Sequence, residues 1–105
     1  MVESLAHNKL VRQIYQYIKK DLSEDKLYCL KADLFETEKP ALTYAGFIPD
    51  VLFCDDETLI IGEAKTFDDF KTEHSYKQYE AYFKECSNYP GETKIIICVP
   101  WQLFY

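Results

Sequence analysis

Apolar residues recur with two different periods along this chain, and the change of period separates helices from strands. From Leu5 to Lys20 they return every three or four positions, which is typical of an amphipathic helix. Ser4 precedes this segment and is suited to cap it. The expected apolar side comprises Ala6, Leu10, Ile14, Tyr17 and Ile18, and the polar side comprises Lys9, Arg12, Gln16, Lys19 and Lys20.

Alternating segments predict three strands in the middle of the chain. The first is expected from Leu27 to Phe35. A hairpin is expected from Asp50 to Cys54 and from Leu59 to Lys65, with residues 55–58 as its turn. The polar segment 36–47 contains proline and glycine and is interpreted as a connection.

The helical period returns from Phe70 to Cys86, and Asn88, Pro90 and Gly91 follow it as stop signals. Lys94 to Val99 is almost wholly apolar, which is typical of a strand covered on both faces. The expected fold is therefore an α/β domain spanning residues 1–105, with elements in the order α-β-β-β-α-β.

The hairpin register predicts a cluster of charges. If residues 55–58 form the turn, Asp50 lies directly opposite Glu63, and Lys65 lies on the same face. Two carboxylates facing each other across paired strands repel and destabilise the sheet. A divalent cation bound by carboxylate oxygens would relieve this repulsion. The alternative is a solvated face with scattered charges, which the apolar residues Leu59 and Ile61 on the same face disfavour.

Polar residues of the two helices can reach the same region. Glu3 and His7 project onto the apolar side of the first helix, so Glu3 is a candidate third acidic group. A frayed first turn, with Glu3 at the helix N-terminus, is the alternative. His7 is better interpreted as a core or hydrogen-bonded histidine than as a catalytic one. In the second helix, residues at intervals of four lie along the margin of the apolar side: His74, Gln78 and Tyr82. The apolar side itself contains Tyr79, Phe83 and Cys86. Polar residues at such a margin either form local hydrogen bonds or line a site.

The composition excludes several classes of protein. With 48% hydrophobic and 16% aromatic residues the chain is too apolar to be disordered. It contains no apolar run of the ~18 residues that a membrane-spanning helix needs, and its first residues lack the apolar core of a secretory signal. Its cysteines show no zinc-ligand spacing and are expected to be reduced in a cytoplasmic protein; they are Cys29, Cys54, Cys86 and Cys98.

The net charge of −6 by itself argues against strong nonspecific binding to nucleic acid. Carboxylates that bind a metal add to the acidic count, however, and a bound cation inverts the local field. The net charge therefore does not by itself exclude a nucleic-acid substrate.

Pro49-Asp50, twelve further residues and Glu63-Ala64-Lys65 together resemble the signature of the PD-(D/E)xK nuclease superfamily. Gln78 and Tyr82 resemble the QxxxY element of its RecB-like branch, and Glu3 resembles the glutamate of the first helix in many members. The resemblance covers nearly the whole chain, although Pro49-Asp50 replaces the GxxDR run of RecB-type members.

This resemblance implies a restriction-endonuclease-like minimal core, in which helices flank a mixed central β-sheet. It implies that Asp50, Glu63 and Lys65 are catalytic. Mg²⁺ or Mn²⁺ would be held by Asp50, Glu63 and the main-chain carbonyl of Ala64, with Glu3 holding a metal-bound water or a second ion. Lys65 would orient the attacking water and offset developing negative charge. The residues that line the site or bind nucleic acid would be His7, His74, Gln78 and Tyr82.

We therefore expect a metal-dependent nuclease that hydrolyses phosphodiester bonds in DNA. A catalytically inactive subunit with the same fold, which binds nucleic acid or serves assembly, is the first alternative. An unrelated α/β interaction module is the second. Apolar residues near the C-terminus suggest a homodimer contact, a larger partner protein or a truncated larger chain; they are Trp101, Leu103, Phe104 and Tyr105.

Overall fold

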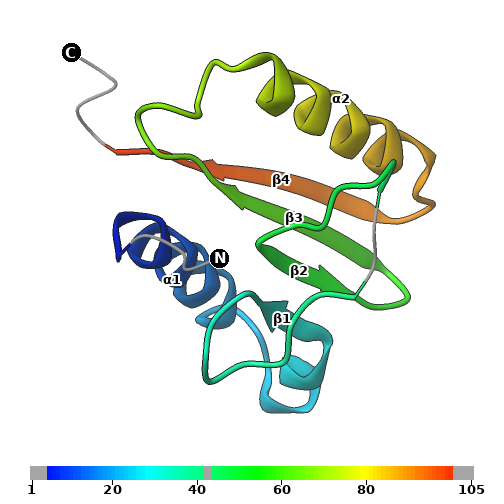
Figure 1. Cartoon of the computed structure of the whole chain (residues 1–105). Helices are drawn as coiled ribbons and strands as arrows, with labels where there is room; N and C mark the ends of the chain where they lie inside the picture. Colours follow the sequence, from blue (N-terminus) through cyan, green and yellow to red (C-terminus); the bar gives the residue numbers. More distant parts are fainter. Residues whose placement is uncertain (1–4, 42–43, 101–105) are drawn as a thin grey trace.

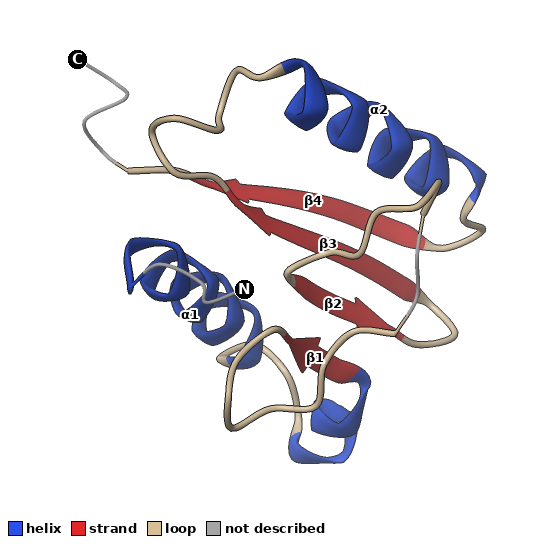
Figure 2. Ribbon diagram, in the orientation of Figure 1, coloured by secondary structure: helices blue, strands red, loops and turns tan. Residues whose placement is uncertain are grey.

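A four-stranded mixed β-sheet separates two helices in the computed structural model, which describes residues 5–41 and 44–100 (Figure 1). Figure 2 shows helices α1 and α2 on opposite faces of this sheet. The elements are α1 (Leu5–Lys19), the 3₁₀ helix η1 (Glu24–Cys29), β1 (Leu30–Ala32), β2 (Val51–Cys54), β3 (Thr58–Ala64), α2 (Glu73–Asn88) and β4 (Glu92–Cys98). Neither long helix of the described residues has the length and apolar character needed to span a membrane.

The strand order is β1-β2-β3-β4, with β1, β2 and β3 antiparallel and β4 parallel to β3. The connection from β3 to β4 passes through α2, as a parallel pair requires. Cys54 pairs with Leu59 and Leu52 pairs with Ile61, so the predicted hairpin register is confirmed. Within the turn, the Asp55 carboxylate accepts two main-chain N–H bonds of 2.8 Å.

Each face of the sheet has its own hydrophobic core. The α1 face buries ten residues: Leu10, Val11, Ile14, Ile18, Leu30, Ala32, Leu34, Val51, Phe53 and Ala64. The α2 face buries Leu52, Leu59, Ile61 and Tyr82. Gly62 lets α1 approach closely, because a Cβ atom there would lie 2.6 Å from Ile14 Cγ2. Alternation along β3 thus directs Leu59 and Ile61 to the α2 core, and Ile60 and Ala64 to the α1 core.

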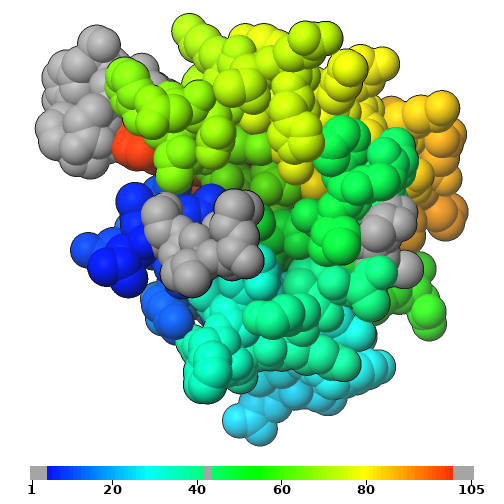
Figure 3. Space-filling view, viewed as in Figure 1, coloured from blue at the N-terminus to red at the C-terminus, as the bar shows by residue number. Residues whose placement is uncertain are grey.

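The connection between β1 and β2 also covers the α2 face. Tyr44 and Phe47 exchange main-chain hydrogen bonds of 2.8 and 3.0 Å around Ala45 and Gly46, both of which have positive φ. The Tyr44 ring then packs edge-on against Tyr82 at 6.2 Å. Figure 3 shows the green segment 44–49 lying against the yellow-green helix α2.

The first strand is much shorter than the sequence pattern predicts. Residues 24–29 form η1, and only Leu30–Ala32 belongs to β1, so the observed order contains an additional 3₁₀ helix. Lys26 stabilises this arrangement through a 2.8 Å ion pair with Asp55 in the hairpin turn. β1 pairs with three of the four residues of β2.

The orientation of α2 also differs from the expected one. The helix begins after Thr72, whose hydroxyl accepts a hydrogen bond from the Ser75 N–H, so Phe70 is not helical. Gln78 and Tyr82 lie on the buried face rather than at its margin, while Phe83 is 59% exposed. The polar residues are buried because they have partners within the site described below.

Two further expectations about burial were wrong. β4 is an edge strand in the described structure, and its apolar residues from Ile95 onward are only partly buried rather than covered on both faces. On α1, Ala6 and Tyr17 are exposed, and Val11 takes a place in the core. The predicted N-cap Ser4 lies outside the described residues.

Candidate active site

Two carboxylates meet where the hairpin strands reach the end of the sheet. The observed register, extended by one pair beyond Val51 and Gly62, places Asp50 opposite Glu63 as predicted. Asp50 is 9% exposed and Glu63 is 3% exposed. Asp50 Oδ2 accepts a 2.9 Å hydrogen bond from the Ala64 N–H, which anchors the loop carboxylate to β3.

The two carboxyl groups share a hydrogen bond and have very different affinities for a proton. Burial and then the nearby Asp50 raise the pKa of Glu63 to about 9. Burial also opposes ionisation of Asp50, but hydrogen bonds with His7, Glu63 and the Ala64 N–H outweigh it and lower the pKa of Asp50. Without a bound cation, the pair therefore carries one proton near neutral pH, and that proton resides on Glu63.

Each carboxyl group has a further partner from a helix. His7 Nε2 of α1 lies 3.3 Å from Asp50 Oδ2, and both side chains are nearly buried. On the other face of the sheet, the Tyr82 hydroxyl donates a 2.7 Å hydrogen bond to Glu63 Oε1. Burial and the adjacent Glu63 raise the pKa of Tyr82, so its hydroxyl remains a donor at neutral pH. Both helices thus fix the carboxyl pair.

Lys65 follows on the same face of β3 and is held by α2. Its Nζ donates a hydrogen bond to Gln78 Oε1, and both side chains are buried. The Lys65 ammonium also lies 5.9 Å from the centre of the Tyr79 ring, within reach of a cation–π interaction. Tyr79 is in turn fixed by a 2.9 Å hydrogen bond from its hydroxyl to the Phe70 carbonyl. The lysine is therefore positioned by two residues one position apart on α2.

A small cavity of about 200 Å³ has Asp50 in its wall. Lys39 forms part of its wall, where its ammonium pairs with Asp33 Oδ1 at 3.2 Å and bonds the Leu34 carbonyl at 3.1 Å. Asp33 also donates its main-chain N–H to the Asp50 carbonyl at 2.8 Å. Asp50 and the ion-paired Lys39 therefore lie on the wall of one hollow.

Most of the residues predicted for the site are brought together, with two exceptions. Glu3 lies outside the described residues. His74 is exposed, and its ring packs edge-on against Phe47 at 5.3 Å, one helical turn before Gln78. Sequence reasoning missed Lys39 and Tyr79, because Lys39 lies in the unassigned connection and Tyr79 was interpreted as an apolar core residue.

The chemistry of the pair suits a hard divalent cation. Mg²⁺ is commonly bound by one or two carboxylates and keeps several waters. The Ala64 carbonyl and the Lys65 N–H belong to the same trans peptide group, so they point in opposite directions. The Lys65 N–H donates to the Cys98 carbonyl of β4. The Ala64 carbonyl therefore points away from β4 and toward the side of Asp50. A cation there would replace the proton on Glu63. Within the described ranges no set of three or more acidic, histidine or cysteine side chains is arranged to hold a metal.

Comparisons of this chain with protein-family models, curated proteins and solved structures found no match.

Proposed function

We propose that this protein is a metal-dependent nuclease that hydrolyses phosphodiester bonds in DNA, built on a restriction-endonuclease-like core. The observation that carries the proposal is the cluster formed by Asp50, Glu63 and Lys65. In this cluster Glu63 stays protonated beside the ionised Asp50, and the buried Lys65 ammonium is held by Gln78 on the same face of the sheet. Buried charges of this kind are costly unless they have a ligand or a partner, and they concentrate at functional sites.

The carboxyl pair would hold one Mg²⁺ or Mn²⁺, with the Ala64 carbonyl as a third oxygen donor. When bound, the cation would polarise the scissile phosphate and lower the pKa of the attacking water. Asp50 is prepared for this role because its hydrogen bonds with His7 and the Ala64 N–H keep it ionised. Glu63 would give up its proton on metal binding, while the Tyr82 hydroxyl continues to orient its carboxylate.

Lys65 would act as an electrostatic catalyst. Its ammonium is held by Gln78, which leaves further N–H groups to donate to the attacking water or to a phosphate oxygen. Donors that are fixed in advance toward developing negative charge typically contribute a rate factor of about 10² to 10³. Lys39, on the wall of the cavity next to Asp50, would attract the phosphate of an incoming strand.

The rest of the chain is compatible with this role. The net charge of −6 includes the two carboxyl groups that a divalent cation would neutralise. We place the protein in the cytoplasm on the strength of its four cysteines, all of which are free thiols.

The proposal is tested by incubating the protein with plasmid, linear duplex, single-stranded and branched DNA in Mg²⁺ or Mn²⁺. Wild type should cleave at least one substrate, and Lys65→Met should reduce the rate by about 10²-fold or more. Lys77→Met is the matched control, because Lys77 is an exposed residue of α2 whose nearest partner is Glu73 at 3.8 Å. Binding of DNA without cleavage would favour the inactive-subunit alternative. Cleavage that survives Lys65→Met would refute the assignment of the site.

A further inference from the structure

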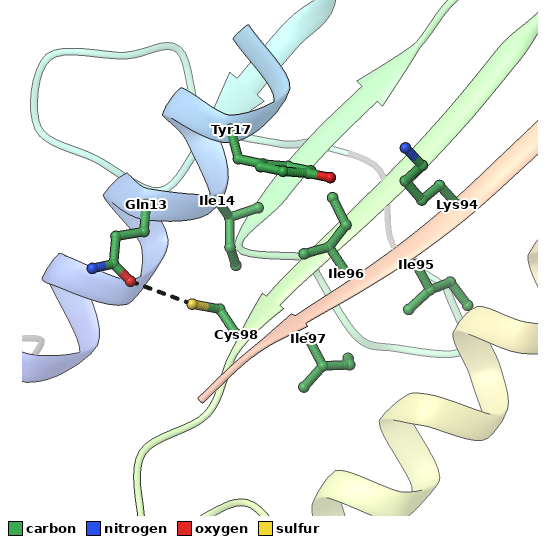
Figure 4. A pocket seen from close by; sticks show the side chains of 8 residues that line it. All are labelled: Gln13, Ile14, Tyr17, Lys94, Ile95, Ile96, Ile97 and Cys98. Atoms are coloured by element: carbon green, nitrogen blue, oxygen red, sulfur yellow. Dashed lines mark hydrogen bonds between the residues drawn. The ribbon is translucent and has the colours of Figure 1, made fainter. Parts of the chain in front are cut away.

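A second hollow lies on the other face of the sheet and takes no part in the carboxylate cluster. Its volume is about 520 Å³, and we call it the α1–β4 groove. Figure 4 shows Ile14 and Tyr17 of α1 facing Ile96 and Cys98 of β4 across it. The groove is lined by Gln13, Ile14, Tyr17 and residues 94–98, among which Lys94 is the one charged side chain. Its walls therefore suit an apolar occupant.

The groove runs beside an open sheet edge. β4 pairs with β3 along one side, and the described residues contain no strand along its other side. Because the Cys98 carbonyl accepts the Lys65 N–H, alternation turns the main-chain groups of Ile95 and Ile97 outward. Natural proteins usually protect such an edge with charge, proline or a bulge. From Ile95 to Cys98 this edge has no charged residue, so it is suited to pair with another extended segment.

The chain itself contains a segment of matching chemistry. Residues 101–105, which lie outside the described part of the structure, read Trp-Gln-Leu-Phe-Tyr and carry no charged side chain. In an extended segment, Trp101, Leu103 and Tyr105 fall on one side. Three large apolar side chains on one side match the apolar walls of the groove. The segment 101–105 also has the same number of residues as the part of β4 that lines the groove, residues 94–98.

The connection from β4 argues against occupation by the same chain. To fold back along β4, the segment would need a two-residue hairpin at Val99 and Pro100. Such hairpins require positive φ at the first or at both central residues, which Val99 strongly disfavours and Pro100 cannot adopt. Residues 99–100 are not part of a turn.

We propose that residues 101–105 of one copy occupy the α1–β4 groove of a second copy, and that the exchange is reciprocal. Each copy then lends an apolar strand to the open β4 edge of its partner, which is the geometry of an exchanged dimer with twofold symmetry. The exchange covers both the apolar walls of the groove and the outward main-chain groups of Ile95 and Ile97. It is independent of the proposed nuclease chemistry, because the groove lies on the opposite face of the sheet from Glu63 and Lys65.

The mass in solution gives the first test. Wild type should run at about twice the chain mass of 12.4 kDa in size-exclusion chromatography with light scattering. Leu103→Asp should convert the dimer to monomer, because a charge would enter the apolar groove. Phe35→Asp is the control and should remain dimeric, since Phe35 is fully exposed in the β1–β2 connection. Circular dichroism confirms that each variant is folded.

A cross-link then identifies the contact. When the five residues lie against residues 94–98, Leu103 is opposite Ile96, so the double variant Leu103→Cys with Ile96→Cys should form an intermolecular disulfide under mild oxidation, and Leu103→Cys alone should not form it. A monomeric wild type would overturn the proposal, as would a dimer that survives Leu103→Asp. A disulfide formed within one chain would show that the segment folds back on its own groove. Failure to form any disulfide dependent on Ile96→Cys would exclude the groove as the contact.

Discussion

Replacing Glu63 by glutamine tests the electrostatics of the carboxyl pair without requiring any catalytic activity. Glutamine has the shape of the protonated acid, so it can accept the hydrogen bond from Tyr82 and donate one to Asp50. It removes the proton equilibrium while keeping the packing. The variant should therefore differ from wild type in how its stability depends on pH.

The magnitude follows from the pKa of Glu63, which is about 9 in the folded protein and 4.5 ordinarily. Between these values the folded protein holds a proton that the unfolded chain releases, so raising the pH favours unfolding. The loss is about 1.4 kcal/mol per pH unit, or about 3 kcal/mol in the free energy of unfolding by pH 7. Asp50 contributes no slope in this window, because its lowered pKa removes stability only as the pH falls through the acid range.

Urea denaturation followed by circular dichroism, in buffers from pH 5 to pH 8 with a chelator, measures this difference. Wild type should lose stability as the pH rises, while Glu63→Gln should lose much less and become the more stable protein at pH 7. Mg²⁺ should restore wild-type stability at pH 8 and leave Glu63→Gln nearly unchanged. Equal slopes for the two proteins would refute the shared proton, and equal effects of Mg²⁺ would refute the pair as its binding site.

Three further predictions address separate parts of the structure. Mn²⁺ binding at pH 7.5 should release about one proton per ion, because Glu63 must become a carboxylate to bind it. Calorimetry in buffers of different ionisation enthalpy measures the proton release, and binding without it would contradict the account. Tyr82→Phe should lower the free energy of unfolding by about 1–3 kcal/mol, because a buried carboxyl group loses its donor; an unchanged urea midpoint would show that this hydrogen bond carries no net stability. Gly62→Ala should cost about 1–3 kcal/mol, because its Cβ would collide with Ile14 between α1 and the sheet; a variant as stable as wild type would show that α1 can shift at no cost.

The hairpin was predictable because its alternation fixes both register and face. A slip of one residue would have moved Leu59 and Ile61 out of the α2 core, so the sequence determines that Asp50 lies opposite Glu63. The position of Lys65 on the same face follows from the same alternation. These three residues, which form the center of the candidate site, could therefore be located from local sequence alone.

The elements that depend on distant partners could not be predicted in this way. The rotation of α2 is set by buried polar contacts, in which Gln78 bonds Lys65 and Tyr82 bonds Glu63, so the apolar pattern indicated the wrong face. The 3₁₀ helix is favoured by the Lys26–Asp55 ion pair between segments 29 residues apart. β4 is partly exposed because it is the edge strand of the described sheet. The apolar sequence of a strand does not show whether that strand lies at the edge or in the middle of a sheet.

The central claim is that the cluster of Asp50, Glu63 and Lys65 is the site of metal-dependent phosphodiester hydrolysis. Its most direct test compares initial cleavage rates of wild type, Asp50→Asn and Asp56→Asn on the best DNA substrate over a range of Mn²⁺ concentrations. Asp56 is an exposed residue of the hairpin turn, so Asp56→Asn makes the same change of charge away from the cluster. The account predicts that Asp50→Asn loses about 10²-fold or more in rate while Asp56→Asn cleaves like wild type. Cleavage by a folded Asp50→Asn protein at the wild-type rate would contradict it.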